Sequence, residues 1–222
     1  MKKWLAVLVS LSLLSVMAGC GGGGGGGSYT VYEAQILSDQ PADGDIAYDP
    51  VDASYLITQG PSTVYFGLDD QNSHVPEYRA FLDFPLDGST GYESVPASAW
   101  IKSATLEVYV NEVSFAAVVP TLIDLVSYPI SGLGVGDYDS SPMATLAVDF
   151  YSSDQGKIVV LDVTPLMREA QRRGLSDLQL RLLLNLSADY GLIGIEDRPT
   201  VSVTAPLLRV YYSYGSGPGW GY

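Results

Sequence analysis

The sequence predicts an all-β fold: an antiparallel β-sandwich with jelly-roll topology and one short crossover helix. Apolar and polar residues alternate with a period of two over most of the body, as in half-buried antiparallel strands. Clusters of Gly, Pro, Asp and Ser separate these stretches and favour turns. A single stretch has helical character, so about nine strands and one helix are expected.

Residues 1–19 have the pattern of a secretory signal peptide. Two lysines form a basic head, and the apolar run that follows is too short for a comfortable membrane span. The residues MAG at 17–19 precede Cys20, the only cysteine, and this junction resembles a bacterial lipobox. In such signals the cysteine becomes the new N-terminus and carries the lipid, so we expect Cys20 to anchor the protein to a membrane. The alternative is an ordinary signal peptide with a chance cysteine, which does not explain the glycines that follow.

Residues 20–28 comprise the cysteine, a run of glycines and a serine. Polyglycine has no side chain to pack and is costly to order, so we expect a flexible tether with a root-mean-square span of about 15 Å. Glycine follows the cysteine, whereas aspartate there is associated with retention in the inner membrane. We therefore expect a lipid-anchored protein of the cell envelope, in the outer membrane if the host has two, on its periplasmic or its outer surface.

The charge balance restricts the partners. Loss of Lys2 and Lys3 with the signal peptide leaves nine basic residues of 11 against 25 acidic ones, a net charge of −16 instead of −14. Basic patches dominate affinity for nucleic acid, so no nucleic-acid partner is expected. The same charge argues against electrostatic docking to anionic lipid or a polyanionic polysaccharide, and it suits divalent cations. A lipidated Cys20 leaves no thiol for a disulfide, so an apolar core must stabilise the domain.

One domain is expected over residues 29–214. The clearest strand patterns lie at 78–84, 104–110, 157–163, 178–186 and 207–214, and weaker ones lie at 54–58, 63–67 and 120–128. Residues 215–222 are rich in glycine and aromatic residues, which predicts a flexible tail. The alternative is a tail that docks on a partner.

One helix is expected after the 157–163 strand. Thr164 can cap it, Pro165 suits its first position, and the sequence LMREAQRR leads to Gly174, which favours a stop. Arg172 and Arg173 in the last turn complement the helix dipole.

Several motifs occur in a particular order. The stretch EYRAFLDFPLDG is followed by IKSATLEVYV and then by LDVTPLMREAQRRG, and Pro206 precedes the last strand. This order resembles the DNRLRE domain, which is related to carbohydrate-binding module family 96, over roughly residues 30–214. The resemblance implies a β jelly roll and a non-catalytic, polysaccharide-binding module of a secreted or surface protein.

The residues argue against an enzyme. His74 is the only histidine, so no His-His metal motif exists, and no G-x-S-x-G elbow is present. With 25 acidic residues, pairs of carboxylates arise by chance and do not indicate a glycosidase. We expect His74 to be a solvated residue of a polar loop.

Acidic loops could hold a structural calcium ion. The stretch DGDIAYDPVD supplies Asp43, Asp45, Asp49 and Asp52, of which Asp43, Asp45 and Asp49 are the principal candidate ligands, and calcium prefers carboxylate oxygens in loops. The alternative is a set of solvated turn aspartates that bind their own backbone.

Alternation divides the strands into two faces. The core face is expected to carry Ala80, Leu82, Phe84, Leu106, Val108, Val110, Leu180, Leu182, Leu184, Leu208, Val210 and Tyr212. The other face is expected to carry Arg79, Phe81, Asp83, Glu107, Tyr109, Arg181, Arg209 and Tyr211. Rings stack on sugars and guanidinium groups donate paired hydrogen bonds, so the predicted ligand residues are Arg79, Tyr109, Arg181, Arg209 and Tyr211. The alternative is a solvated face with cross-strand Arg–Glu pairs, and a slip of one residue would exchange the faces.

Two functions follow from these patterns. The first is a surface-anchored bacterial lipoprotein whose jelly roll binds a neutral or calcium-bridged polysaccharide without catalysis. The second is a structural or assembly protein that contacts other surface proteins through its tyrosine-rich face or its C-terminal tail.

Overall fold

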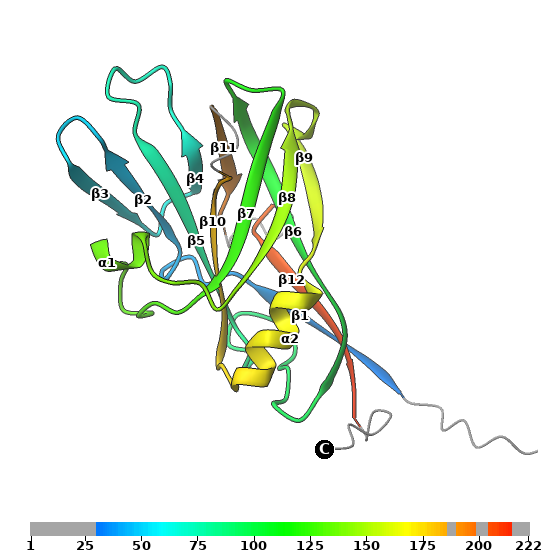
Figure 1. Ribbon diagram of the computed structural model, residues 1–222. Coiled ribbons are helices and arrows are strands. Elements are labelled where there is room, and N and C mark those ends of the chain that lie inside the picture. Colours follow the sequence, from blue (N-terminus) through cyan, green and yellow to red (C-terminus); the bar gives the residue numbers. More distant parts are fainter. Residues whose placement is uncertain (1–29, 186–189, 199–203, 215–222) are drawn as a thin grey trace, which may run out of the picture.

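A computed structural model describes residues 30–185, 190–198 and 204–214 of the chain. The predicted signal peptide, Cys20, the glycine tether and the 215–222 tail lie outside these residues. Within them the fold is mostly antiparallel β, in a sheet that curls around its core (Figure 1). No helix of the described part is long and apolar enough to span a membrane.

Twelve strands and two α-helices make up the described domain. The strands are β1 (Val31–Leu37), β2 (Gly44–Asp49), β3 (Ser54–Gln59), β4 (Thr63–Leu68), β5 (Glu77–Pro85), β6 (Trp100–Ser114), β7 (Val118–Val126), β8 (Ala144–Tyr151), β9 (Lys157–Asp162), β10 (Asp177–Leu184), β11 (Gly191–Glu196) and β12 (Leu207–Ser213). The helices are α1 (Val135–Tyr138) and α2 (Thr164–Arg173), with a 3₁₀ turn at Ser152–Asp154.

Hydrogen bonding is continuous through the sheet. The main order is β1-β12-β6-β11-β4-β5-β10-β7-β8, while β2 joins β5, β3 joins β2 and β9 joins β6. The long strand β6 pairs with β12 at one end and β11 at the other, while β9 pairs with the middle of β6 along its opposite edge. β6 thereby joins β11, β12 and β9 within one sheet. Its pairing register shifts by one residue against both β11 and β12, and such irregularities bend a strand.

The main core lies inside the curled sheet. Every residue expected on the core face is buried there: Ala80, Leu82, Phe84, Leu106, Val108, Val110, Leu180, Leu182, Leu184, Leu208, Val210 and Tyr212. Burial of each large apolar side chain contributes about 1.5–3 kcal/mol. Helix α2 contacts β6, β7, β8 and β10 and adds Leu166, Met167 and Ala170 to this core.

A second apolar cluster covers the opposite face of β5, and it corrects the expectation of an open polar surface there. Phe81 is fully buried against Ile46 of β2 and against Tyr128, Leu133 and Tyr138 of the chain between β7 and β8. Asp83 is also fully buried. Alternation placed both residues correctly opposite the main core, but it carried no information about the segments that fold over them.

All eight predicted strands occur, and four strands were missed: β1, β2, β8 and β11. Helix α2 ends as predicted, because Gly174 adopts the left-handed conformation with φ of 67°. The predicted cap is wrong. Thr164 is the first helical residue, its hydroxyl exchanges hydrogen bonds with the backbone of Ala104, and the carboxylate of Asp162 accepts from the Thr164 N–H at 2.9 Å.

Candidate functional site

A groove of about 220 Å³ lies on the outer face of β6, β9 and β12. It is lined by Glu107, Tyr109, Ile158, Thr204, Ala205, Leu207 and Arg209. The β6 residues of this set alternate with buried core residues, which is why their side chains point outward. The groove brings together two of the predicted ligand residues, Tyr109 and Arg209.

Arg209 lies between two glutamates on the neighbouring strands. Its Nε is 2.5 Å from Oε1 of Glu107, and its Nη1 is 2.9 Å from Oε1 of Glu33. Although burial opposes ionisation of Glu33, hydrogen bonds from Arg209 and Gln35 outweigh it and lower the pKa of Glu33. The described contacts of Arg209 use its Nε and Nη1.

Tyr109 supplies the aromatic wall of the groove. It pairs across the strands with Ile158, which is 46% exposed, and the next β9 side chain on this face, Val160, is 59% exposed. Tyr211 lies on the same face, beside Glu33 on β1 and Ser103 on β6, but it does not line the groove. An apolar strip therefore borders a charged one, an arrangement that can take a ring with hydroxyl groups on its rim.

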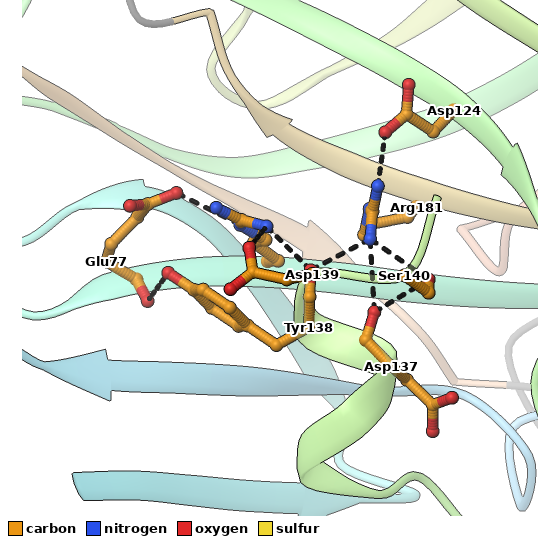
Figure 2. A network of polar contacts seen from close by, with 8 residues as sticks. Glu77, Asp124, Asp137, Tyr138, Asp139, Ser140 and Arg181 are labelled. Carbon is orange, nitrogen blue, oxygen red and sulfur yellow. Dashed lines mark hydrogen bonds and ion pairs between the residues drawn. The ribbon is translucent and has the colours of Figure 1, made fainter. Parts of the chain in front are cut away.

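Arg181 is not on an open face, which corrects the prediction for this residue. Only 3% of it is exposed. Its Nη1 donates to the carbonyls of Asp137 and Tyr138 at 3.1 and 2.8 Å and to the hydroxyl of Ser140 at 3.1 Å (Figure 2). Its Nη2 donates to Oδ2 of Asp124 at 2.6 Å. Arg181 thus fastens α1 and its surroundings to the sheet.

Arg79 makes a similar contact from β5. Its guanidinium lies 3.8 Å from the ring centre of Tyr138 and donates to the Tyr138 carbonyl at 2.6 Å. It also forms ion pairs with Glu77 at 3.0 Å and Asp139 at 2.8 Å. The prediction grouped Arg79 and Arg181 with the groove residues, but the structure places them under the chain that joins β7 to β8.

The three predicted calcium ligands make separate contacts. Asp43 is fully buried, and its Oδ1 accepts from the Asp83 N–H at 2.6 Å. Asp45 accepts from the Tyr65 N–H at 3.1 Å, and burial raises its pKa to about 6. Asp49 hydrogen-bonds to His74. The three residues thus have separate partners and are not brought together in the single site that was expected.

Asp49, Asp52 and His74 have ligand atoms within 4.8 Å of one another. Nδ1 of His74 lies 2.6 Å from Oδ2 of Asp49 and 3.7 Å from Oδ2 of Asp52. The hydrogen bond to Asp49 raises the pKa of His74 and lowers that of Asp49. His74 is therefore hydrogen-bonded to Asp49 rather than purely solvated. Sequence reasoning grouped Asp49 with Asp52 as possible calcium ligands but did not include His74, because it lies 25 residues from Asp49 along the chain.

A cavity of about 270 Å³ lies between α2 and the chain that follows β5. Its lining is mainly apolar and includes Leu86, Val95, Pro96, Met167 and Leu175. The amide of Gln171 donates to the carbonyls of Ala99 and Pro96 at its edge. This cavity offers few directed polar groups, so the smaller groove around Tyr109 and Arg209 is the better candidate for recognition of a polar ligand.

Comparison with known proteins adds no assignment. No model of a known protein family matches the chain. No curated protein matches it either.

Proposed function

We propose that this protein is a lipid-anchored bacterial surface protein whose β domain binds polysaccharide without catalysis. The observation that carries the proposal is the groove in which Tyr109 stands beside Glu107 and Arg209. The resemblance of the motif order to the DNRLRE domain supports the same function. The proposal extends to the topology: the curled sheet is the two-layered jelly roll of such a module, with α2 as the crossover from β9 to β10.

The groove suits a sugar for chemical reasons. A pyranose has an apolar face that packs on an aromatic ring and hydroxyl groups that bind charged donors and acceptors. Tyr109 and Ile158 supply the apolar side, while Arg209 and Glu107 supply a donor and an acceptor. With a mature net charge of −16, derived from nine basic and 25 acidic residues, we expect a neutral glycan or one bridged by calcium.

The position of the groove fits an anchor at Cys20. β1 starts at Val31, which pairs with Ser213 at the end of β12, so the proposed tether joins this end of the sheet. The groove residue Leu207 lies six residues from Ser213 along β12. At about 3.4 Å per residue, the groove stands about 20 Å from the anchored end. A membrane-bound domain would therefore hold the groove away from the lipid.

Lipidation and glycan capture can be tested together on intact cells. The protein should incorporate an alkyne-labelled fatty acid and fractionate with the outer membrane, and Cys20→Ser should abolish both. Cells that display the protein should retain a fluorescent neutral polysaccharide, and Tyr109→Ala should reduce this retention without loss of labelling. Fatty-acid labelling that persists in Cys20→Ser would contradict the proposed anchor, and equal retention by cells that lack the protein would contradict the proposed binding.

A protein partner is the second candidate function. β9 pairs with β6 alone among the described strands, and Ile158 and Val160 are exposed on it. An open strand edge with apolar side chains can pair with another chain. In that case Val160→Lys should disrupt a surface complex, as should deletion of residues 216–222 if the tail docks, while no glycan would bind the purified domain.

A further inference from the structure

Three fully buried carboxylates lie directly before β2, on strand β5 and directly after β11, and Asp43 interacts with each of the other two. Asp43, Asp83 and Asp197 each have 0% exposure. Oδ1 of Asp43 accepts from the Asp83 N–H at 2.6 Å, and Oδ1 of Asp197 accepts from the Ser38 hydroxyl at 3.2 Å. These contacts satisfy only one oxygen on each of two carboxylates.

The remaining oxygens make no hydrogen bond of good geometry among the described residues, although Gln179 lies near enough to Asp83, and Ser38 near enough to Asp43, to lower their pKa values. Oδ2 of Asp43, Oδ2 of Asp197 and both carboxylate oxygens of Asp83 are buried without a hydrogen bond. The hydroxyl of Tyr128 is also buried without one, and its electrostatic surroundings are dominated by Asp43 and Asp83. Since buried polar groups are almost always paired, this set of oxygens indicates a group that completes the site.

Among the described residues, no basic side chain is a cause of the pKa shifts of these carboxylates. The charged groups that act on Asp43 are Asp197 and Asp83. Asp177 and Asp39 act on Asp83, and Asp39 acts on Asp197. Burial is the main reason that the pKa of Asp83 and that of Asp197 rise to about 6, and burial also raises the pKa of Asp43 well above its usual value. One proton shared by Asp43 and Asp197 would neutralise one of three carboxylates.

We propose that Asp43 and Asp197 bind one calcium ion, with the Ser38 hydroxyl beside them and the carboxylate of Asp83 adding negative charge. The site offers only oxygen atoms, which calcium accepts in six- to eightfold coordination, and no nitrogen or sulfur that would favour a transition metal. Calcium also tolerates irregular geometry better than magnesium does. Asp43 belongs to the set that the sequence indicated, but Asp197 does not, because it lies more than 150 residues from Asp43, as the separation of 159 between Ser38 and Asp197 implies.

The ion would connect distant parts of the chain and reach the groove. Gln40 already ties the turn before β2 to the Asp197 carbonyl at 2.8 Å. The neighbour of Asp197, Glu196, accepts at 2.8 Å from the hydroxyl of Thr204, which lines the groove. A cation at Asp197 would therefore hold one wall of the groove in place. This coupling depends on the proposed function, whereas the cation site itself does not.

The test is thermal unfolding and calorimetric titration of the mature chain carrying Cys20→Ser, at pH 7.5, in chelator and in calcium. We expect one calcium ion per chain, and a rise in Tm of about 5–10 °C when calcium exceeds its Kd by a hundredfold. Asp43→Asn and Asp197→Asn should each abolish this shift. In chelator both variants should melt no lower than the wild type, because each removes an uncompensated buried charge.

Asp52→Asn is the matched control, since it removes the same charge from the exposed cluster of Asp49, Asp52 and His74. It should keep the full calcium shift. A wild-type Tm that is identical in chelator and calcium would overturn the proposal without reference to any variant. A shift that is lost in Asp52→Asn and kept in Asp43→Asn would also overturn it, because calcium would then bind at the exposed loops.

Discussion

Arg181 and Asp124 form a buried ion pair, with 2.6 Å between Nη2 and Oδ2 and with both side chains at most 5% exposed. Nη1 of the same guanidinium donates to the carbonyls of Asp137 and Tyr138. Burying either charge alone would carry a large desolvation cost, and the attraction between the two charges at this distance offsets that cost. The pair therefore fixes the segment between β7 and β8 over the second apolar cluster.

Removal of Arg181 should strongly destabilise the domain. We expect Arg181→Met to lower the free energy of unfolding by about 3–5 kcal/mol, because it leaves the buried carboxylate of Asp124 without its partner. The double variant with Asp124→Leu should recover much of this loss. Urea unfolding of both variants measures the difference, and equal stability of Arg181→Met and the wild type would contradict the structural role.

Gly67 should be the least replaceable glycine of the sheet. Its φ is +110°, and a Cβ there would lie 2.0 Å from the carbonyl oxygen of Gly191. We expect Gly67→Ala to cost about 3 kcal/mol or more through backbone strain and this clash. Gly136→Ala is the control, because that site has open space and helical backbone, so its cost should stay within about 0.5 kcal/mol.

The residues of the main core were predictable from the sequence, whereas the segments that fold over the outer face of β5 and β10 were not. Period-two alternation identified the inward side chains of β5, β6, β10 and β12, because one face of each strand meets the same core. β8 also alternates, but between half-buried and exposed positions with Phe150 as its one buried residue, so the pattern was weak. The Arg181 contacts with α1 join positions more than 40 residues apart, and alternation cannot show that a loop covers a polar face.

The groove was partly predictable for the same reason. Tyr109, Arg209 and Tyr211 belong to strands whose outward face stays open, so alternation placed all three on one surface. Arg79 and Arg181 lie on the equivalent face of β5 and β10, where the chain folds back. The pairing of Asp43 with the Asp197 region needed the fold itself, since no local spacing relates these residues.

Stability in chelator should decrease as the pH rises from about 4 to 7. Burial raises the pKa of Asp45, Asp83 and Asp197 from 3.8 to about 6, so the folded state binds more protons than the unfolded state in this range. Their stabilising effect is complete below the unfolded pKa and is lost as the pH passes about 6. A rise of about two pH units in one pKa corresponds to roughly 3 kcal/mol.

The measurement is the urea midpoint at pH 4.5 and pH 7.5 in chelator. Asp45→Asn should reduce the difference between the two values. His74 also makes the folded state more stable at low pH, because its hydrogen bond to Asp49 raises its pKa and this stability is lost as the pH rises. The pair is exposed to solvent, so this effect should be small. A midpoint that is higher at pH 7.5 would contradict the assignment of buried, protonated carboxyl groups.

Tyr109 should be the principal contact for a glycan. We expect Tyr109→Ala to weaken binding at least about tenfold, since an aromatic face that covers a sugar contributes roughly 1.5–3 kcal/mol. Tyr109→Phe should bind nearly as well as the wild type, because it keeps the ring. Tyr92→Ala, at a side chain that is 89% exposed and outside the groove, should have no effect. Affinity electrophoresis of the three variants provides the comparison.

The most direct measurement is binding of residues 28–222 to a panel of soluble and insoluble polysaccharides, in calcium and in chelator. The account predicts saturable binding to one class of neutral or calcium-bridged glycan, with weaker binding in chelator. Absence of binding to every member of the panel in calcium, by a folded domain, would contradict polysaccharide recognition and favour a protein partner on the β9 edge.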